Sequence, residues 1–504
     1  MDLFSNLLMG LSVAVTPMNL LYLMIGALVG MIVGVIPGFG PAAGLAILLP
    51  ITFGMDPIGA VVMMAAIYYA AFYGGTITSI LLNTPGESAT VAATFDGYPL
   101  AKQGRAGPAL VMQAAASFVG GTIGVLLITL LAPLFTQLAR SFGPPEFFLL
   151  AMMGLLTLIV MLGGNWRYGV ISALIGFGLG TVGVDLETGV QRFTFGSAEL
   201  IGGIDFIPIA IGLFGLGELY YAFYSGLHAT GSGGIVRYQE ERRFWPELRD
   251  WIETRVTFLR ASLLGFCIGV IPGAGATIAS LMAYSIEKSA SRQPEKFGKG
   301  AMAGLVAPEA ANNAASAGAM VPLLTLGIPG SAATAVLLAA FLLWGLRPGP
   351  LLMSQNPEFA WGLIASMYLG NVALLALNIF AIPLFVWIVK VPYRILAPAV
   401  ILVCTIGTFS VHGSIVETWL MFAAGIAGFF MRLFGFSPAA LVLALVLGPI
   451  AEEALRQTLT ISRGSFAIFV QRPASVWIIV VMSAVLLAAP VTRRLRRALR
   501  SQSA

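Results

Sequence analysis

Charged side chains are scarce in this sequence. Lys, Arg, Asp and Glu together make up 10% of its 504 residues, whereas soluble chains carry about a quarter. A chain of this length with so few charges cannot cover itself with a water-soluble surface, which excludes an ordinary globular enzyme. Apolar stretches of about 20 residues recur instead, and the mean hydropathy is +0.92. We therefore predict an all-α integral membrane protein in a lipid bilayer.

Cysteine and histidine are nearly absent as well. Cys267 and Cys404 lie in apolar stretches and indicate small buried side chains rather than a disulfide or a metal site. His228 and His412 lie near the ends of apolar spans without metal-ligand spacing, and we interpret both as structural. The sequence contains no Gly-x-x-x-x-Gly-Lys-Ser/Thr loop and no Ser/His/Asp set. We expect no enzyme activity, no catalytic residues and no organic cofactor.

The basic residues are concentrated in a few loops and in the C-terminal tail. The net charge of +5 therefore indicates the positive-inside pattern of a membrane protein and not nucleic-acid binding. The first 18 residues contain no Lys or Arg, so they lack the charged start of a cleavable signal peptide. We expect a short amphipathic helix at the membrane surface there.

One seven-residue stretch occurs twice and interrupts an apolar run each time. Residues 34–40 read GVIPGFG and residues 269–275 read GVIPGAG. Pro removes a helical N–H and clashes with the preceding turn, while Gly lets the backbone leave helical geometry. In lipid, such a break is tolerated only where it is buried in protein or lines a wet cavity. A second pair, at 83–88 and 327–331, follows two stretches rich in small residues. Paired breaks in two halves are typical of a transporter's binding site.

The breaks divide the chain into two repeats. We expect a first transmembrane repeat at 1–235, a charged cytoplasmic interfacial linker at 236–256, a second repeat at 257–460, and an extra helix with a basic cytoplasmic tail at 461–504. The 287–299 loop has four basic residues, whereas its counterpart at 54–57 has none. The positive-inside rule then places equivalent loops on opposite sides of the membrane. We predict inverted-topology repeats with re-entrant helical hairpins and about 10–12 transmembrane helices.

Broken helices expose free N–H groups, which attract anions, and free carbonyls, which coordinate Na⁺. Hydroxyl and amide side chains lie beside the breaks, as a carboxylate ligand requires. For any one of them, close helix packing by small residues is the simpler explanation. The predicted substrate- and cation-binding residues, with a possible Na⁺ site at the same loops, are Pro37, Gly38, Gly40, Asn83, Thr84, Pro85, Gly86, Ser88, Pro272, Gly273, Gly275, Asn312, Asn313, Gly327, Pro329, Gly330 and Ser331.

Two acids, Glu87 and Glu309, lie within the apolar part of the chain. An ionisable group at membrane depth is a functional candidate, which binds a cation or a proton. The alternative is that each lies at a helix end near water, where Glu is favourable at an N-terminus. The sequence does not decide between the two interpretations.

Residues 34–60, 70–110 and 269–350 resemble the large membrane subunit of the tripartite tricarboxylate transporters. This resemblance extends over essentially the whole chain. It implies a permease of the bacterial inner membrane that takes up tricarboxylates or related carboxylates by secondary active transport. The implied coupling ion is Na⁺ or H⁺, and the implied partners are a periplasmic substrate-binding protein and a small four-helix membrane subunit. The sequence does not tell which carboxylate is carried or the oligomeric state. The alternatives are the membrane subunit of a Na⁺-pumping carboxylate decarboxylase and an ATP-driven permease.

Overall fold

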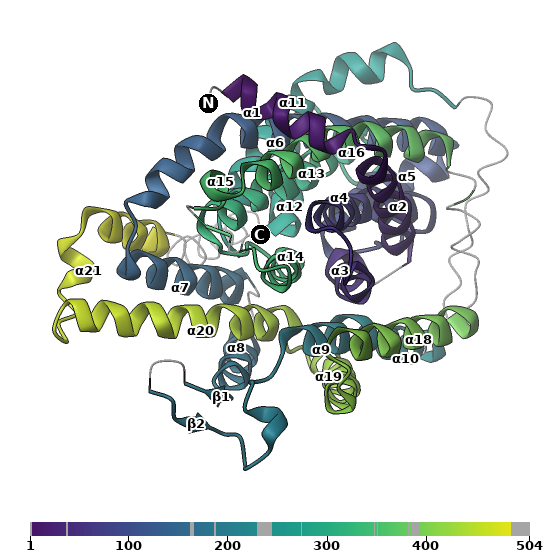
Figure 1. Ribbon diagram of the computed structural model, residues 1–504. Coiled ribbons are helices and arrows are strands. Elements are labelled where there is room, and N and C mark those ends of the chain that lie inside the picture. Colours follow the sequence, from purple (N-terminus) through teal and green to yellow (C-terminus); the bar gives the residue numbers. More distant parts are fainter. Residues whose placement is uncertain are drawn as a thin grey trace, which may run out of the picture.

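A computed structural model describes residues 3–36, 39–161, 166–185, 188–228, 244–273, 275–346, 348–349, 351–381, 384 and 393–484. Helices make up nearly all of the secondary structure in these ranges, and the two short strands form one antiparallel pair (Figure 1). This confirms the prediction of an all-α membrane protein. The predicted site residues Pro37 and Gly38, and the C-terminal tail, lie outside the described residues.

The elements of the first half follow one another with short connections. They are α1 (Leu3–Ala14), α2 (Pro17–Val35), α3 (Gly40–Leu48), η1 (Leu49–Thr52), α4 (Pro57–Leu82), η2 (Ser88–Thr90), α5 (Val91–Lys102), α6 (Ala106–Arg140), α7 (Pro144–Met161), α8 (Trp166–Gly180), β1 (Gly183–Val184), β2 (Gln191–Arg192), η4 (Ala198–Leu200), α9 (Phe206–Ala210), η5 (Ile211–Leu216) and α10 (Gly217–His228). The η5 segment is a π-helical turn that joins α9 to α10 in one continuous helix.

The second half presents a similar order of elements. They are α11 (Leu248–Val270), α12 (Gly275–Ala290), η7 (Pro294–Lys296), α13 (Met302–Leu326), α14 (Ala332–Leu343), α15 (Leu352–Gln355), α16 (Pro357–Phe380), α18 (Tyr393–His412), α19 (Ile415–Leu433), α20 (Pro438–Ile461) and α21 (Ile468–Gln471). The expected boundary between linker and second repeat, at 256, lies inside α11, because this helix continues without a break from the linker to the second GVIPGAG stretch.

In the described part of the chain, seven helices are long and apolar enough to cross a membrane. They are α2, α4, α6, the α9–α10 helix, α16, α19 and α20. Pro stands in the first turn of α2, α4, α16 and α20, where its missing N–H costs no helical hydrogen bond. The breaks leave α3 and α14 as shorter apolar helices. The number of crossings, which we expect to be 10–12, stays a prediction.

Within each half, the helix before the first break packs closely against the helix before the second break. A Cβ added at Gly34 on α2 would overlap the carbonyl oxygen of Ala71 on α4. A Cβ added at Gly269 on α11 would overlap the carbonyl oxygen of Ala315 on α13 in the same way. Glycine thus lets each pair of backbones touch, as small residues do between membrane helices. The equivalence of the two GVIPG stretches therefore extends to their helix neighbours.

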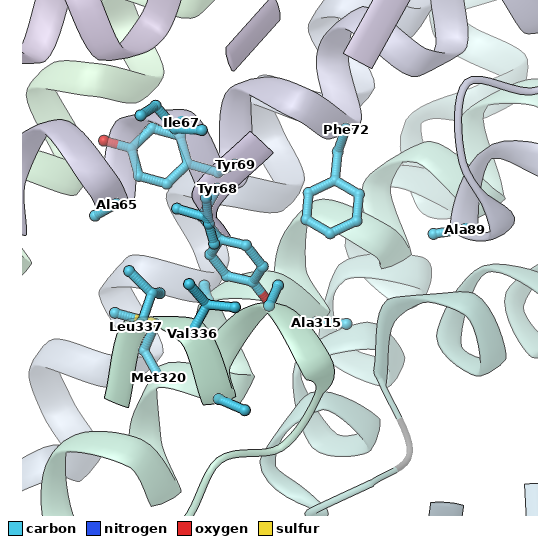
Figure 2. Close-up of a cluster of buried hydrophobic side chains, with 14 of the residues drawn as sticks. Ala65, Ile67, Tyr68, Tyr69, Phe72, Ala89, Ala315, Met320, Val336 and Leu337 are labelled. Carbon is cyan, nitrogen blue, oxygen red and sulfur yellow. The ribbon is translucent and has the colours of Figure 1, made fainter. Parts of the chain in front are cut away.

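Long helices of each half also pack against the other half, so the two halves do not form separate bodies. α6 packs along α13 and α11 of the second half, and α16 packs along α4 and α2 of the first (Figure 1). Further along the chain, α19 lies against the α9–α10 helix, while α20 lies along α7 and α8. These reciprocal contacts build a core from side chains of both halves. Figure 2 shows this core where Tyr68 of α4 approaches Val336 of α14, while Tyr69 points to the other side of α4.

Polar contacts tie the halves together at one end of the molecule. Arg105, after α5, lies 2.7 Å from Asp250 of α11. The side chain of Gln103 donates to the carbonyl oxygen of Lys299 at 2.7 Å. The buried carboxylate of Asp96 on α5 accepts the backbone N–H groups of Gly298, Gly300 and Ala301. The loop with Lys102 and Arg105 therefore meets the start of α11 and the basic 287–299 loop at the same end.

Candidate functional site: a cavity between the helix breaks

The first pair of breaks restarts a helix at a glycine in the left-handed region. Gly40 begins α3 with φ +55°, and Gly275 begins α12 with φ +63°. This conformation costs an L-residue with a side chain roughly 1–2 kcal/mol, which explains glycine at both positions. Each helix therefore begins at the break with unsatisfied N–H groups.

The second pair of breaks ends α4 and α13 with a left-handed residue as well. Asn83 has φ +55° and Gly327 has φ +71°. Beyond Asn83 and Gly327 the backbone folds back along the helix that it has just left. In the first half, the N–H of Gly86 donates to the carbonyl oxygen of Gly75 at 3.2 Å. In the other half, the N–H of Gly273 donates to the carbonyl oxygen of Gly330 at 2.9 Å. The two breaks of the second half are thus in direct contact.

All the breaks border one cavity of about 680 Å³. Its wall includes the starts of α3, η2, α12, α14 and α20, which come from both halves. Across the wall, the hydroxyl groups of Ser88 and Thr277 form a hydrogen bond of 2.8 Å between the halves. Aromatic side chains form part of the wall, namely Phe39, Tyr68, Phe72 and Phe214. A volume of this size suits a small organic molecule.

The structure brings seven of the predicted site residues to this cavity. They are Gly40, Pro85, Gly86, Ser88, Gly273, Gly275 and Ser331. A second group lies in the same loops but does not line the cavity, namely Asn83, Thr84, Pro272, Gly327, Pro329 and Gly330. Their role in binding stays a prediction. Because Asn83 and Gly327 end helices in the left-handed region, backbone geometry already accounts for them.

Asn312 and Asn313 lie elsewhere, buried in the middle of α13. The amide nitrogen of Asn313 donates to the side-chain oxygen of Asn312 at 2.6 Å, and that of Asn312 donates to Glu309 at 3.2 Å. Neither residue lines the cavity at the breaks. The sequence placed them beside the loops because they are close in the chain, but the helix continues for three turns before it breaks.

Sequence reasoning missed two charged residues of the cavity wall. Arg432 on α19 forms an ion pair with Glu218 on α10, and its guanidinium lies 4.7 Å from the ring centre of Tyr221. Each charged residue adjoins an otherwise apolar span, and a charge at membrane depth is a functional signal by itself. Their pairing joins elements far apart in the chain and therefore shows only in the structure.

The electrostatics of the wall combine helix N-termini, one guanidinium group and two carboxyl groups. The partial positive charges of the N-termini of α3, α12, α14 and α20 meet at the cavity, and at the last two the side chains of Ser331 and Ser437 already accept the N–H groups of Thr334 and Ala440. Arg432 adds a full positive charge, which its partner Glu218 balances. Glu87 adds a second carboxyl group to the wall. Hydroxyl donors are present at Ser331 and Ser437. The wall can thus bind a carboxylate through backbone dipoles, hydroxyl groups and one guanidinium.

The geometry of Asn83 yields a prediction about stability. Replacing Asn83 by Ala should cost about 1 kcal/mol, because Ala enters the left-handed region less readily than Asn, whereas Asn83→Gly should be neutral. We expect Asn83→Ala to lower the Tm of the purified protein by about 1 °C, with the uptake affinity unchanged. Gly327→Ala in the other half should cost more, because its Cβ would also overlap the carbonyl oxygen of Pro348. An Asn83→Ala variant with normal Tm and weakened affinity would show that the side chain contacts the ligand.

Comparison with known proteins gives the site its context. The sequence model of the "Tripartite tricarboxylate transporter TctA family" matches residues 20–443. An uncharacterised 52.8 kDa protein from the TAR-I ttuC' 3' region of Agrobacterium vitis is 41% identical over 473 residues, which cover 94% of this chain and 93% of that protein. An uncharacterised protein from the TAR-II ttuC' 3' region of the same organism is 43% identical over 209 residues, covering 42% of this chain and 86% of that protein. No solved structure matches. The chain belongs to the tripartite tricarboxylate transporter TctA family.

Proposed function

We propose that this protein is the permease subunit of a tripartite carboxylate uptake system in the bacterial inner membrane. A cation gradient drives the import of tricarboxylates or related carboxylates. A periplasmic substrate-binding protein delivers the ligand, and a small four-helix membrane subunit completes the complex. Membership of the TctA family supports the permease role and the presence of further subunits. The substrate class and the energy source are our inference from the site.

The convergence of helix starts from both halves on one cavity carries this proposal. An anion that leaves water for the protein interior incurs a large desolvation cost unless hydrogen-bond donors replace its hydration. The starts of α3, α12 and α14 supply backbone donors there, and Arg432 supplies a charge-assisted one. The apolar wall, with Phe39 and Phe72, matches the carbon skeleton of an organic acid. An inorganic cation alone needs no such aromatic wall.

We further propose that the two repeats have inverted topology. The reciprocal packing of α6 and α16 and the duplicated glycine contacts support two equivalent units. Lys102, Arg105 and the 287–299 loop meet at one end, and the positive-inside rule assigns that end to the cytoplasm. The 54–57 turn, which contains no basic residue, then belongs to the periplasmic side. A carrier built this way alternates access by moving one repeat against the other.

Single-cysteine labelling tests this orientation. We expect Met55→Cys to react with a membrane-impermeant maleimide in intact cells, and Gln293→Cys to react only after permeabilisation. The background needs Cys267→Ser, because Cys267 is exposed, whereas Cys404 is buried. Labelling of both positions from the same side would contradict the inverted repeat.

Uptake by membrane vesicles tests the function. Vesicles that contain the complete system should accumulate radiolabelled citrate, or a related carboxylate that the binding protein recognises, when a Na⁺ or H⁺ gradient is imposed without ATP. Uptake that requires ATP would instead indicate a primary pump. Loss of the carboxyl group as CO₂ during Na⁺ movement would indicate the membrane subunit of a decarboxylase. Either result would overturn the proposal.

A further inference from the structure

A second polar centre lies away from the cavity, around Glu309 in the middle of α13. The Glu309 side chain has 0% exposure. Its Oε1 accepts the hydroxyl of Thr76 on α4 at 2.8 Å and the amide of Asn312 at 3.2 Å. Its Oε2 accepts the hydroxyl of Ser117 on α6 at 3.2 Å. Three helices from the two halves therefore meet at one carboxyl group.

The buried carboxyl groups of the described region differ in which groups stabilise their negative charge. Glu146 pairs with Arg472 at 2.7 Å, and Glu287 pairs with Arg260 at 2.7 Å. Asp96 accepts a Tyr284 hydroxyl and three backbone N–H groups. Glu309, like Asp96, has only neutral donors in the described residues, but it accepts side chains alone, and no Lys, Arg or His pairs with it. Burying a carboxylate without a counter-charge is costly, which makes Glu309 a candidate to hold a proton or a small cation.

The other titratable groups around Glu309 do not supply that charge. Tyr73 of α4 and Glu87 in the loop after α4 are near enough to interact with it electrostatically, and neither carries a positive charge. α6 has no titratable residue between 106 and 139. On α16, the hydroxyl of Tyr368 bonds to Thr129. The charged groups of α5, α11 and α12 that pack on α13 have partners of their own, namely Asp96, Asp250, Arg260 and Glu287.

A small space lies further along α13, and neither Glu309 nor its donors Thr76, Ser117 and Asn312 line it. A cavity of about 10 Å³ lies between α4, α6, α13 and α16, and this is about the minimum that holds one water-sized particle. Oxygen-bearing side chains line it, namely those of Tyr69, Asn313, Ser316 and Asn371. Among the described residues, the buried hydroxyl of Tyr69 has no hydrogen-bond partner. Figure 2 shows that this hydroxyl points away from the side of α4 on which the Tyr68 hydroxyl lies.

We propose that Glu309 is the site at which the transporter takes up its coupling cation, a Na⁺ ion or a proton. This inference rests on the proposed cation-driven function and names its residue. The hydroxyl oxygens of Thr76 and Ser117 surround the carboxyl and serve either ion, while Asn312 presents its amide nitrogen to it. Because α4 and α13 both continue into breaks at the cavity, neutralising Glu309 changes the packing of the helices that position the substrate loops. Under this proposal the Na⁺ site lies in the middle of α13 and not at the loops, where the sequence predicts it.

Thermal unfolding of the purified full-length protein tests cation binding without a substrate. In NaCl, against choline chloride at equal ionic strength and pH 8, the wild type should gain at least about 2 °C in Tm. Glu309→Gln keeps the size of the side chain, removes its charge and replaces one acceptor oxygen by an NH2 donor, and should abolish the gain. If the ion is a proton, Na⁺ has no effect, but the wild type loses Tm relative to Glu309→Gln as the pH rises from about 5, where an unfolded Glu loses its proton, to about 9. Equal Na⁺ and pH responses in both proteins would overturn the proposal.

A second variant keeps the test decisive if Glu309→Gln does not fold. Ser117→Ala should raise the Na⁺ concentration that gives half the Tm gain by about 5–10-fold, since one ligand hydroxyl is lost, or should shift the pH response. The matched control is Ser366→Ala, whose buried hydroxyl donates to the carbonyl oxygen of Leu363 in its own helix. Responses of Ser117→Ala that equal those of the control would overturn the proposal. Because no uptake is measured, this failure is distinguishable from failure of the carboxylate transport function.

Discussion

Replacing Gly86 by Val is expected to abolish uptake. A Cβ at this position would overlap the carbonyl oxygen of Gly34 and approach the Cα of Gly75, so the clash is with backbone that has no room to move. The substitution would push the loop off α4 and break the hydrogen bond from the Gly86 N–H to Gly75. Glu87 and Ser88, which follow in the cavity wall, would move with it. The measurement is carboxylate uptake by vesicles, divided by the amount of protein in the membrane.

Gly86→Ala and Gly330→Ala form the matched pair, because the change from Gly to Ala adds the same Cβ at the equivalent position of each half. A Cβ at Gly330 would lie 3.5 Å from the Ala319 Cβ and 3.7 Å from the carbonyl oxygen of Gly269, which are ordinary contacts. We expect Gly330→Ala, unlike Gly86→Ala, to retain uptake. If Gly86→Val also transports normally at a normal amount in the membrane, the paired breaks are packing devices, and the substrate must bind elsewhere.

Replacing Arg432 by Gln is expected to raise the KM for the carboxylate by about 10–100-fold. A hydrogen bond to a charged group contributes about 1.5–3 kcal/mol, and Arg432 is the guanidinium that lines the cavity in the described residues. This side chain pairs with Glu218. A bound carboxylate would compete with Glu218 for it. The measurement is the substrate dependence of uptake in vesicles.

Two further variants separate recognition from stability. Glu218→Gln frees Arg432 from its acid partner, so the KM should stay the same or fall. Arg472→Gln breaks a different ion pair, with Glu146 on α7, and should lower the Tm but leave the KM unchanged. An unchanged KM in Arg432→Gln, with normal uptake, would exclude this side chain from substrate recognition.

Several properties followed from the residues alone, because they depend on local chemistry. Scarce charge and long apolar runs require a helical membrane protein, and Pro-Gly within such runs requires a break. Gly40 and Gly275 occupy equivalent places in the duplicated stretch, and both adopt the left-handed conformation that only glycine enters freely. The same duplicated stretches carry the resemblance to the family. None of these inferences needs to know which helices are neighbours.

Tertiary structure decided which of these residues act together. Gly86 and Gly330 are equivalent in the sequence, yet Gly86 presses against two backbones while Gly330 has room, because the two loops meet different neighbours. Asn312 belongs to the centre around Glu309, since a helix face turns it toward α4 and α6 rather than toward the nearby break. Arg432 and Glu218 lie far apart in the chain, and only the packing of α19 on α10 joins them. Contacts of this kind depend on how the two halves interlock, and a linear pattern of residue types carries no record of that packing.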